Sequence, residues 1–156
     1  MNKIIRKIQY SEKVYRFDVE APLIAKSRKA GNFVIIRVDA NSERMPLTIA
    51  DADIEKGTIT LVVQKVGLSS TKLCNLNEGD EIHDVVGPLG NPTHIENFGT
   101  VLCAGGGVGV APMLPIIKAL KAAGNRVLSV IAGRSKDLVI MEDEVRASSD
   151  ELIIMT

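Results

Sequence analysis

The stretch VLCAGGGVGVAP at residues 101–112 decides the fold, because a short apolar run leads directly into four glycines among five residues. An unbroken apolar run of this length is typical of a buried strand in a parallel sheet. Residues 113–123 then carry apolar side chains at helical spacing, with Lys118 and Lys121 on the other side. Strand, glycine-rich turn and helix in this order predict the opening of an α/β nucleotide-binding unit.

The residues that follow continue the alternation of strand and helix. Gly124 ends the first helix, and residues 127–132 form a second apolar run. We expect a second helix over residues 136–147 and a third strand over residues 152–154, which predicts a parallel sheet with right-handed crossovers. Three strands are a thin support for two helices. We therefore expect the chain to be truncated at its C-terminus, or its open edge to be covered by something else.

The N-terminal half has the period of two that is typical of half-buried strands. Residues 14–20 alternate apolar with charged side chains, which predicts that one face lies in water. Similar runs, with no convincing helix between them, occupy residues 33–38, 59–63 and 81–86. Short, evenly spaced strands of this kind predict a small antiparallel barrel.

A cluster of turn formers at residues 87–92 separates the two patterns. We therefore expect an antiparallel β-barrel over residues 1–96 and an incomplete α/β domain over residues 97–156.

Composition excludes several classes of function. With 19 basic and 19 acidic side chains among 156 residues, the net charge is zero, which argues against a nucleic-acid partner. No stretch approaches the roughly 20 apolar residues that span a bilayer, so no membrane partner is expected. Two well-separated cysteines, Cys74 and Cys103, favour a reducing, cytoplasmic location and supply no metal site. His83 and His94 show no ligand spacing.

The glycine-rich turn is the first candidate site. Glycines let a backbone approach a pyrophosphate closely, and a helix start offers free N–H groups, where a proline at the first position wastes none. Val110 stands where the usual dinucleotide fingerprint has its third glycine, and no P-loop Gly-Lys-Ser/Thr follows. The alternative is a tight turn that needs its glycines for packing alone. The candidate binding residues are Gly105, Gly106, Gly107, Val108, Gly109 and Pro112.

Three further segments carry groups that suit a nucleotide or a flavin. In residues 44–50, the arginine could bind a phosphate and the threonine hydroxyl could bind the edge of a heterocycle. The alternative is that the arginine is a solvated residue on an edge strand and binds nothing. Residues 67–73 carry three hydroxyls and a lysine at the start of a helix, where they could bind a phosphate. The alternative is that they only cap the helix. In residues 133–137, Arg134 is compatible with a ribose 2′-phosphate, or the segment is a charged loop that caps the next helix.

In their order, these motifs resemble the ferredoxin–NADP reductase superfamily, in which an antiparallel Greek-key FAD-binding barrel precedes a parallel-sheet nucleotide domain. The resemblance covers essentially the whole chain. It is nearest to electron-transfer subunits of the dihydroorotate dehydrogenase type and to the small subunits of sulfide dehydrogenase and NADH-dependent ferredoxin:NADP oxidoreductase. It rests on GNFV at residues 31–34, RMPLTIA at 44–50, GPLG at 87–90 and GGGVGVAP at 105–112.

The resemblance implies roles for individual residues. Arg44 would neutralise the FAD pyrophosphate, Leu47 would lie against the isoalloxazine where the family usually has an aromatic, and Thr48 would act catalytically near flavin N5. The glycine-rich turn would cradle the pyrophosphate of NAD(P)H. The remaining implied binding residues are Met45 and Pro46 beside the flavin, Gly67, Ser69, Ser70 and Thr71 over the FAD phosphates, and Arg134.

The implied function is an NAD(P)H-dependent FAD oxidoreductase. FAD would take hydride and pass electrons to a [2Fe-2S] cluster and a catalytic or larger flavoprotein subunit. Relatives bind that cluster in a cysteine-rich C-terminal segment that this chain lacks, so the cluster is expected only in a longer form. One alternative is a non-catalytic flavin- or nucleotide-binding docking module. The other, a methyltransferase, predicts an acidic residue where Gly133 and Arg134 stand.

Overall fold

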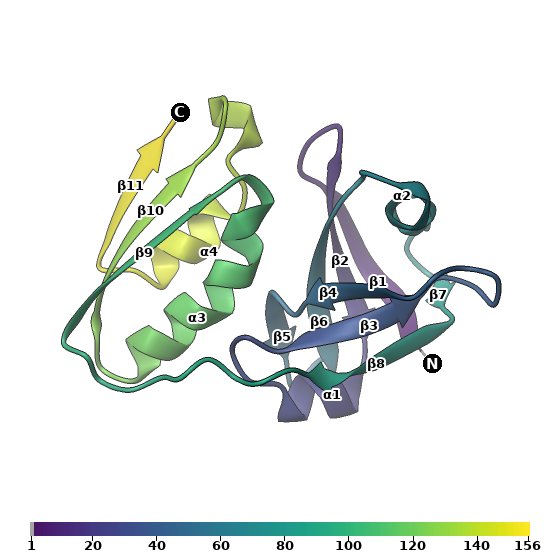
Figure 1. The fold of residues 1–156 in the computed structure, drawn as a ribbon, viewed down its shortest axis with the longest axis horizontal. Helices are drawn as coiled ribbons and strands as arrows, with labels where there is room; N and C mark the ends of the chain where they lie inside the picture. The colour runs from purple at the N-terminus through teal and green to yellow at the C-terminus, as the bar shows by residue number, and fades with distance from the viewer. Residues whose placement is uncertain (1) are drawn as a thin grey trace.

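The computed structural model describes residues 2–156. The N-terminal part of the chain forms eight strands and two short helices (Figure 1). The larger sheet has the order β5-β6-β2-β1-β7 and the smaller sheet the order β4-β3-β8, with neighbours antiparallel in both. This arrangement confirms the predicted antiparallel barrel. The elements are β1 (Asn2–Gln9), β2 (Val14–Glu20), α1 (Pro22–Ser27), β3 (Phe33–Arg37), β4 (Met45–Thr48), β5 (Asp51–Asp53), β6 (Thr58–Gln64), α2 (Leu68–Cys74), β7 (Glu81–Ile82) and β8 (Asp84–Leu89).

Two expectations for this half were wrong. Helix α1 interrupts a region predicted to hold strands only. It is too short to show a period, but Pro22 pre-sets the backbone of its first turn, and the Ser27 hydroxyl donates to the Leu23 carbonyl at 2.7 Å. The strand expected over residues 81–86 is two strands, because the chain passes from one sheet to the other at His83.

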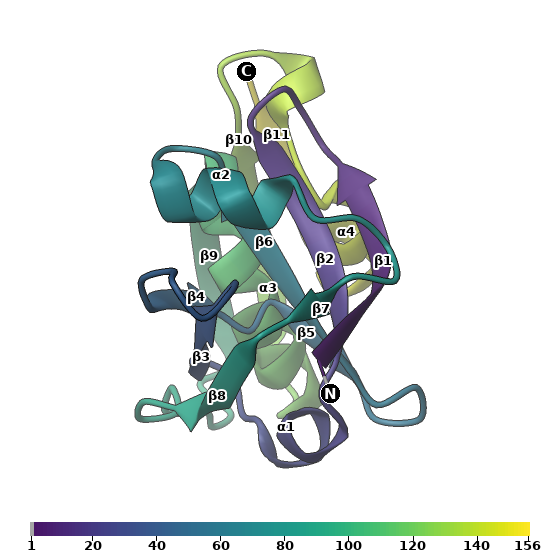
Figure 2. The same cartoon turned by 90° about the vertical axis from the view of Figure 1, so that its right-hand side faces the viewer.

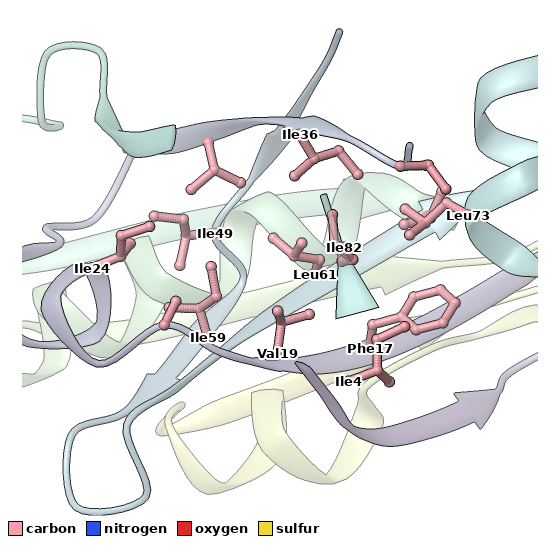
Figure 3. Packing of buried hydrophobic residues seen from close by; sticks show 14 of the residues in the cluster. Ile4, Phe17, Val19, Ile24, Ile36, Ile49, Ile59, Leu61, Leu73 and Ile82 are labelled. Carbon is pink, nitrogen blue, oxygen red and sulfur yellow. The ribbon is translucent and has the colours of Figure 1, made fainter. Parts of the chain in front are cut away.

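The barrel core lies between the two sheets (Figure 3). Phe17 and Val19, the apolar members of the alternating run in β2, are fully buried. They meet Ile59 and Leu61 of β6 and Ile36 of β3 in one cluster. Burial of this aliphatic set accounts for the stability of a barrel that contains few aromatic side chains.

The second half is a parallel three-stranded sheet in the order β11-β10-β9, as predicted. Helices α3 and α4 lie between this sheet and the barrel (Figure 1). Within residues 2–156 the other face of the sheet is open, and it exposes Leu102, Ile153 and Met155. The elements are β9 (Thr100–Gly106), the 3-10 turn η1 (Gly107–Gly109), α3 (Val110–Ala122), β10 (Arg126–Ala132), the 3-10 turn η2 (Lys136–Leu138), α4 (Glu142–Ala147) and β11 (Glu151–Met155).

Two details of this half differ from expectation. The single helix predicted over residues 136–147 is broken between η2 and α4. Val139 is extended and Met141 is left-handed with φ 56°, which lets Ile140 and Met141 enter the core. Pro112 is the third residue of α3 rather than the first, which a proline tolerates because the N–H groups of the first turn have no helical partner.

The two halves share a packed and charged interface. Ala50 of the barrel half is buried in the second core cluster, and Val62 packs against that cluster. Lys118 of α3 bonds Asp51 at 2.8 Å. The charged face of β2 was expected to lie in water, but only Glu20 is exposed, whereas Arg16 and Asp18 are largely buried and Arg16 pairs with Glu144 of α4 at 3.2 Å. The division into residues 1–96 and 97–156 stays a proposal.

No helix within residues 2–156 has both the length and the apolar character needed to cross a membrane.

Candidate functional site

A cavity of about 370 Å³ lies on the barrel between β4 and the start of α2, and we call it the barrel groove. Its walls come from β4, the end of β6 and the turn into α2, so segments distant in sequence meet there. Six predicted binding residues line it, namely Met45, Pro46, Leu47, Gly67, Ser69 and Ser70. Glu43, Val63, Gln64, Val66 and Leu68 complete the lining.

Strand β4 is accessible from the groove because it is an edge strand of the smaller sheet. It pairs with β3, with Leu47 opposite Val34. Met45 and Leu47 are half-buried and pack against the barrel core, so their positions are fixed from within. The resulting wall is aliphatic, and it can contact a flat ring through van der Waals packing but not through aromatic stacking.

Arg44 and Thr48 flank this wall without being part of the lining of the groove. Arg44 directly precedes β4 and is exposed, and within residues 2–156 its guanidinium forms no ion pair. Thr48 ends β4 and is half-buried, and its hydroxyl forms no hydrogen bond within the same residues. Both side chains keep their full bonding capacity for a ligand that extends beyond the groove.

The start of α2 divides the predicted hydroxyl residues by what they contact. Ser70 is buried, and its Oγ accepts the N–H groups of Val66 and Gly67, both at 2.9 Å. This hydroxyl therefore holds the turn into the helix. Ser69 faces the groove with a half-exposed side chain, whereas Thr71 is not among the lining residues.

A second cavity of about 510 Å³ lies against the glycine-rich turn, and we call it the loop groove. Three predicted binding residues line it: Gly107 and Val108 at the turn and Arg134 after β10. Gly105, Gly106, Gly109 and Pro112 are not part of the lining. The barrel contributes Ser11, Glu12, Lys13, Val14 and Gln64, and the rest of the wall is Gly133, Leu138 and Ile140.

Gly107 and Gly105 of the glycine-rich turn are required for different physical reasons. Gly107 has φ +55° and faces open space, so a side chain there would be strained and would point away from the protein's own packing. At Gly105 an added Cβ would lie 3.2 Å from the Met113 Sδ and 3.3 Å from the Gly109 carbonyl oxygen. Gly105 therefore serves close packing of the turn on its helix, and Gly107 leaves the groove accessible.

Gln64 lines both cavities. It is the last residue of β6, and it is exposed at the point where the barrel meets the glycine-rich turn. Ligands in the two grooves would therefore meet at this side chain. Gln64 is not among the residues predicted from the sequence, where the one available signal is a polar residue that ends the apolar run of residues 59–63.

The loop groove offers positive charge and backbone groups rather than a set of acids and bases. Within residues 2–156, Arg134 and Lys13 form no ion pair, and no three His, Cys, Asp or Glu side chains gather to hold a metal. Near Arg134, a hydrogen bond from Ser135 lowers the pKa of the Asp137 carboxyl, so this group is ionised at neutral pH. Such a site can bind and orient phosphate-bearing ligands.

A larger cavity of about 680 Å³ lies between the turn after α1 and helix α3. It shares no lining residue with either groove and contains none of the predicted site residues.

Comparisons with known proteins confirm the resemblance seen in the sequence. The chain is 47% identical over 154 residues to the Thermotoga maritima protein named "Dihydroorotate dehydrogenase B (NAD(+)), electron transfer subunit homolog". The matched region covers 99% of this chain and 55% of that protein. The chain spans about half the length of the curated relatives it matches. No protein-family model matches it.

Solved structures support the same fold. A structure described as the NADH-dependent reduced ferredoxin–NADP oxidoreductase of flavin-based electron bifurcation matches with a TM-score of 0.95 and 44% identity, over 99% of this chain and 56% of that one. Phthalate dioxygenase reductase matches with a TM-score of 0.76 and 22% identity, over 96% and 50%. The fold is therefore that of ferredoxin–NADP reductase-like proteins, as predicted.

Proposed function

We propose that this chain, a relative of dihydroorotate dehydrogenase B electron-transfer subunits, is the flavin- and nucleotide-binding part of an NAD(P)H-dependent oxidoreductase. FAD would occupy the barrel groove, and NADH or NADPH the loop groove. The observation that carries the proposal is Gln64, because it lines both cavities and so brings a ligand of one within reach of a ligand of the other.

The barrel groove and the residues that flank it offer groups that suit FAD. Met45 and Leu47 give the flat ring an apolar wall, and the unpaired Arg44 guanidinium suits the pyrophosphate. We assign Thr48 as the residue whose hydroxyl donates to or accepts from the flavin edge near N5. Pro46, Gly67, Ser69, Ser70 and Thr71 would complete the FAD site, with Ser70 acting through the turn that it holds.

The loop groove fits the dinucleotide. Gly107 carries no side chain where the turn borders the groove, and the first backbone N–H groups of η1, which have no helical partner, would be available to a ligand that lies on the turn. Arg134 supplies a cation after the second parallel strand, where it can meet a ribose phosphate. The remaining members of this site are Gly105, Gly106, Val108, Gly109 and Pro112, which shape the turn.

Bound FAD supplies the redox chemistry, since it accepts a hydride from NAD(P)H and can release electrons singly. The chain's own residues bind the two cofactors, align them across Gln64 and exclude competing contacts. This division of labour agrees with the lining residues of the two grooves, among which, within residues 2–156, no acid and base form a pair.

In a longer form of the protein, we propose that electrons leave the flavin through a [2Fe-2S] cluster to a catalytic or larger flavoprotein subunit. Two descriptions support this route for the electrons. The Thermotoga maritima relative is named as an electron-transfer subunit homolog, and phthalate dioxygenase reductase is described as transferring electrons from pyridine nucleotides to [2Fe-2S]. Both cysteines of the chain are free thiols, which suits a cytoplasmic location.

The test is the visible absorption spectrum of the purified chain, followed by anaerobic addition of NADH and then of NADPH. Flavin bands that bleach support the proposal and identify the preferred donor. Flavin bands that persist with both donors favour a flavin-binding docking module. A colourless protein that takes up no added FAD contradicts the proposal and revives the methyltransferase alternative.

A further inference from the structure

We propose that the β1–β2 hairpin of the barrel is the second wall of the dinucleotide site, and that Lys13 at its tip binds a phosphate of the ligand opposite Arg134. The inference rests on the proposed function, because it assumes that a dinucleotide occupies the loop groove. Lys13 lies in the barrel half, more than 90 residues before the glycine-rich turn, and no sequence motif connects the two.

Hydrogen bonds hold the backbone of the hairpin in place. The N–H groups of Tyr10 and Ser11 both donate to the Val14 carbonyl, at 2.8 and 3.2 Å, and this closes the turn. The Lys65 N–H donates to the Lys13 carbonyl at 2.7 Å and ties the tip to the segment after β6. The position of Lys13 is therefore set by the barrel, while its side chain remains exposed.

Apolar contacts fix the hairpin against the nucleotide half. Tyr10 and Val14, one on each side of the tip, pack against the core cluster that contains residues of α3 and α4. Figures 1 and 2 show the hairpin tip and the β10–α4 connection at the same end of the molecule. As a result, Lys13 and Arg134 line one cavity of about 510 Å³ although they come from different halves of the chain.

The charges of this cavity favour a phosphate group. Within residues 2–156, neither Lys13 nor Arg134 forms an ion pair, and the turn of Gly107 and Val108 adds no side-chain charge. Glu12 is an acidic residue in the lining, and its carboxylate weakens the positive field without cancelling it. Two cations that line one concave surface bind a pyrophosphate more tightly than either one alone.

The test is calorimetric titration of the FAD-loaded chain with ADP-ribose, which carries the pyrophosphate but cannot reduce a flavin. We expect Lys13→Gln to weaken ADP-ribose binding about fivefold and to reduce its dependence on salt, as loss of one charge-assisted contact does. Glu12→Gln should tighten binding about twofold. Lys26→Gln is the matched control, since Lys26 is exposed on α1 and lines none of the described cavities, and it should leave the affinity unchanged.

The outcomes separate this inference from the proposed function. Unchanged binding in Lys13→Gln, together with lost binding in Gly107→Val, overturns the role of the hairpin and leaves the dinucleotide site in place. Equal weakening by Lys13→Gln and Glu12→Gln points to a distorted hairpin rather than to charge, and it also overturns the inference. If the unmodified chain holds FAD but binds no ADP-ribose, the dinucleotide site and the inference both fail.

Discussion

Arg44 is the residue on which FAD affinity should depend most strongly. Its exposed guanidinium has no ion-pair partner within residues 2–156, so the folded protein gains little from it in the absence of a ligand. We expect Arg44→Ala to weaken FAD binding by about tenfold or more, since hydrogen bonds to a charged group contribute about 1.5–3 kcal/mol. The measurement is the ratio of flavin to protein after gel filtration, followed by titration with FAD. The free energy of unfolding of the apoprotein should stay within about 0.5 kcal/mol.

Arg6→Ala is the matched control, because Arg6 is exposed on β1 and does not line the barrel groove. Full flavin occupancy in Arg44→Ala would remove Arg44 from the pyrophosphate role. An equal loss in both variants would indicate a general effect of charge.

Gly107→Val should prevent dinucleotide binding and leave FAD in place. The residue has φ +55° and borders the loop groove, so a valine there is strained in the backbone and projects into the ligand's space. The measurement is calorimetric titration with ADP-ribose alongside the flavin spectrum. Gly99→Val is the control for strain alone, since Gly99 has φ +99°, faces open space and lies outside the groove. Normal ADP-ribose affinity in Gly107→Val would sink the assignment of the turn.

Single residues could be predicted where one local motif carries the chemistry. The glycine-rich turn and the segment from Arg44 to Thr48 are of this kind, and their roles remain predictions. Gln64 and Lys13 could not be found from the sequence, because each enters the loop groove only through the packing of one half on the other. Ser70 shows a further limit of prediction from the sequence. Its hydroxyl is chemically suited to bind a phosphate, but in the structure it accepts hydrogen bonds from the N–H groups of its own turn.

Asp150 links three elements of the nucleotide half, and its charge should make that half sensitive to acid. Its carboxylate accepts from Lys121 Nζ at the end of α3 at 2.6 Å and from the Val127 N–H of β10 at 2.7 Å. These bonds, with that to Lys121 the stronger, lower the pKa of Asp150 in the folded protein. Asp150 then binds a proton more readily in the unfolded chain than in the folded protein. The contribution of this carboxylate to the stability of the folded protein is therefore present above about pH 4 and is lost as the pH falls through the lowered pKa.

We therefore expect Asp150→Asn to lower the melting temperature at pH 7 and to lose less stability than the unmodified chain below pH 4. Melting temperatures from pH 7 to pH 2.5 test this. Glu55→Gln is the control, because Glu55 is exposed and forms no ion pair within residues 2–156. Parallel pH profiles for Asp150→Asn and the unmodified chain would contradict the role of this carboxylate.

Elements were predictable from the sequence in proportion to their length and regularity. Strand β2 and helix α3 have seven and thirteen residues, and their periods are unambiguous. Helix α1 and helix α4 have six residues each, too few to establish a period against the flanking loops. The break before α4 depends on a left-handed Met141, a conformation that no local preference of methionine indicates and that burial of its side chain enforces.

At the scale of the whole molecule, a partly buried charge network joins the two halves. Arg16 lies on the barrel and is only 12% exposed, with Asp18 Oδ1 at 3.1 Å and Glu144 Oε1 of α4 at 3.2 Å. Burial alone would lower the pKa of this guanidinium, but its bonds to Tyr10 and Asp18 raise it, so Arg16 is always charged. Thr60 donates a hydrogen bond to Asp18 at 2.7 Å and holds the carboxylate in place. The relative position of the two grooves therefore depends on a charge that is expensive to leave unpaired.

We expect Arg16→Met to reduce the free energy of unfolding by about 3 kcal/mol, because it leaves Asp18 buried without its cation. Glu144→Gln should cost about 1 kcal/mol, since Glu144 is 34% exposed and keeps an acceptor for Arg16. Arg126→Met is the matched control: its pair with Glu151 has a similar distance of 3.0 Å but is 58% and 62% exposed, and its loss should cost less than about 0.5 kcal/mol. Urea unfolding measures all three. If Arg16→Met costs no more than Arg126→Met, packing alone holds the halves together, and the alignment of the two grooves does not depend on this network.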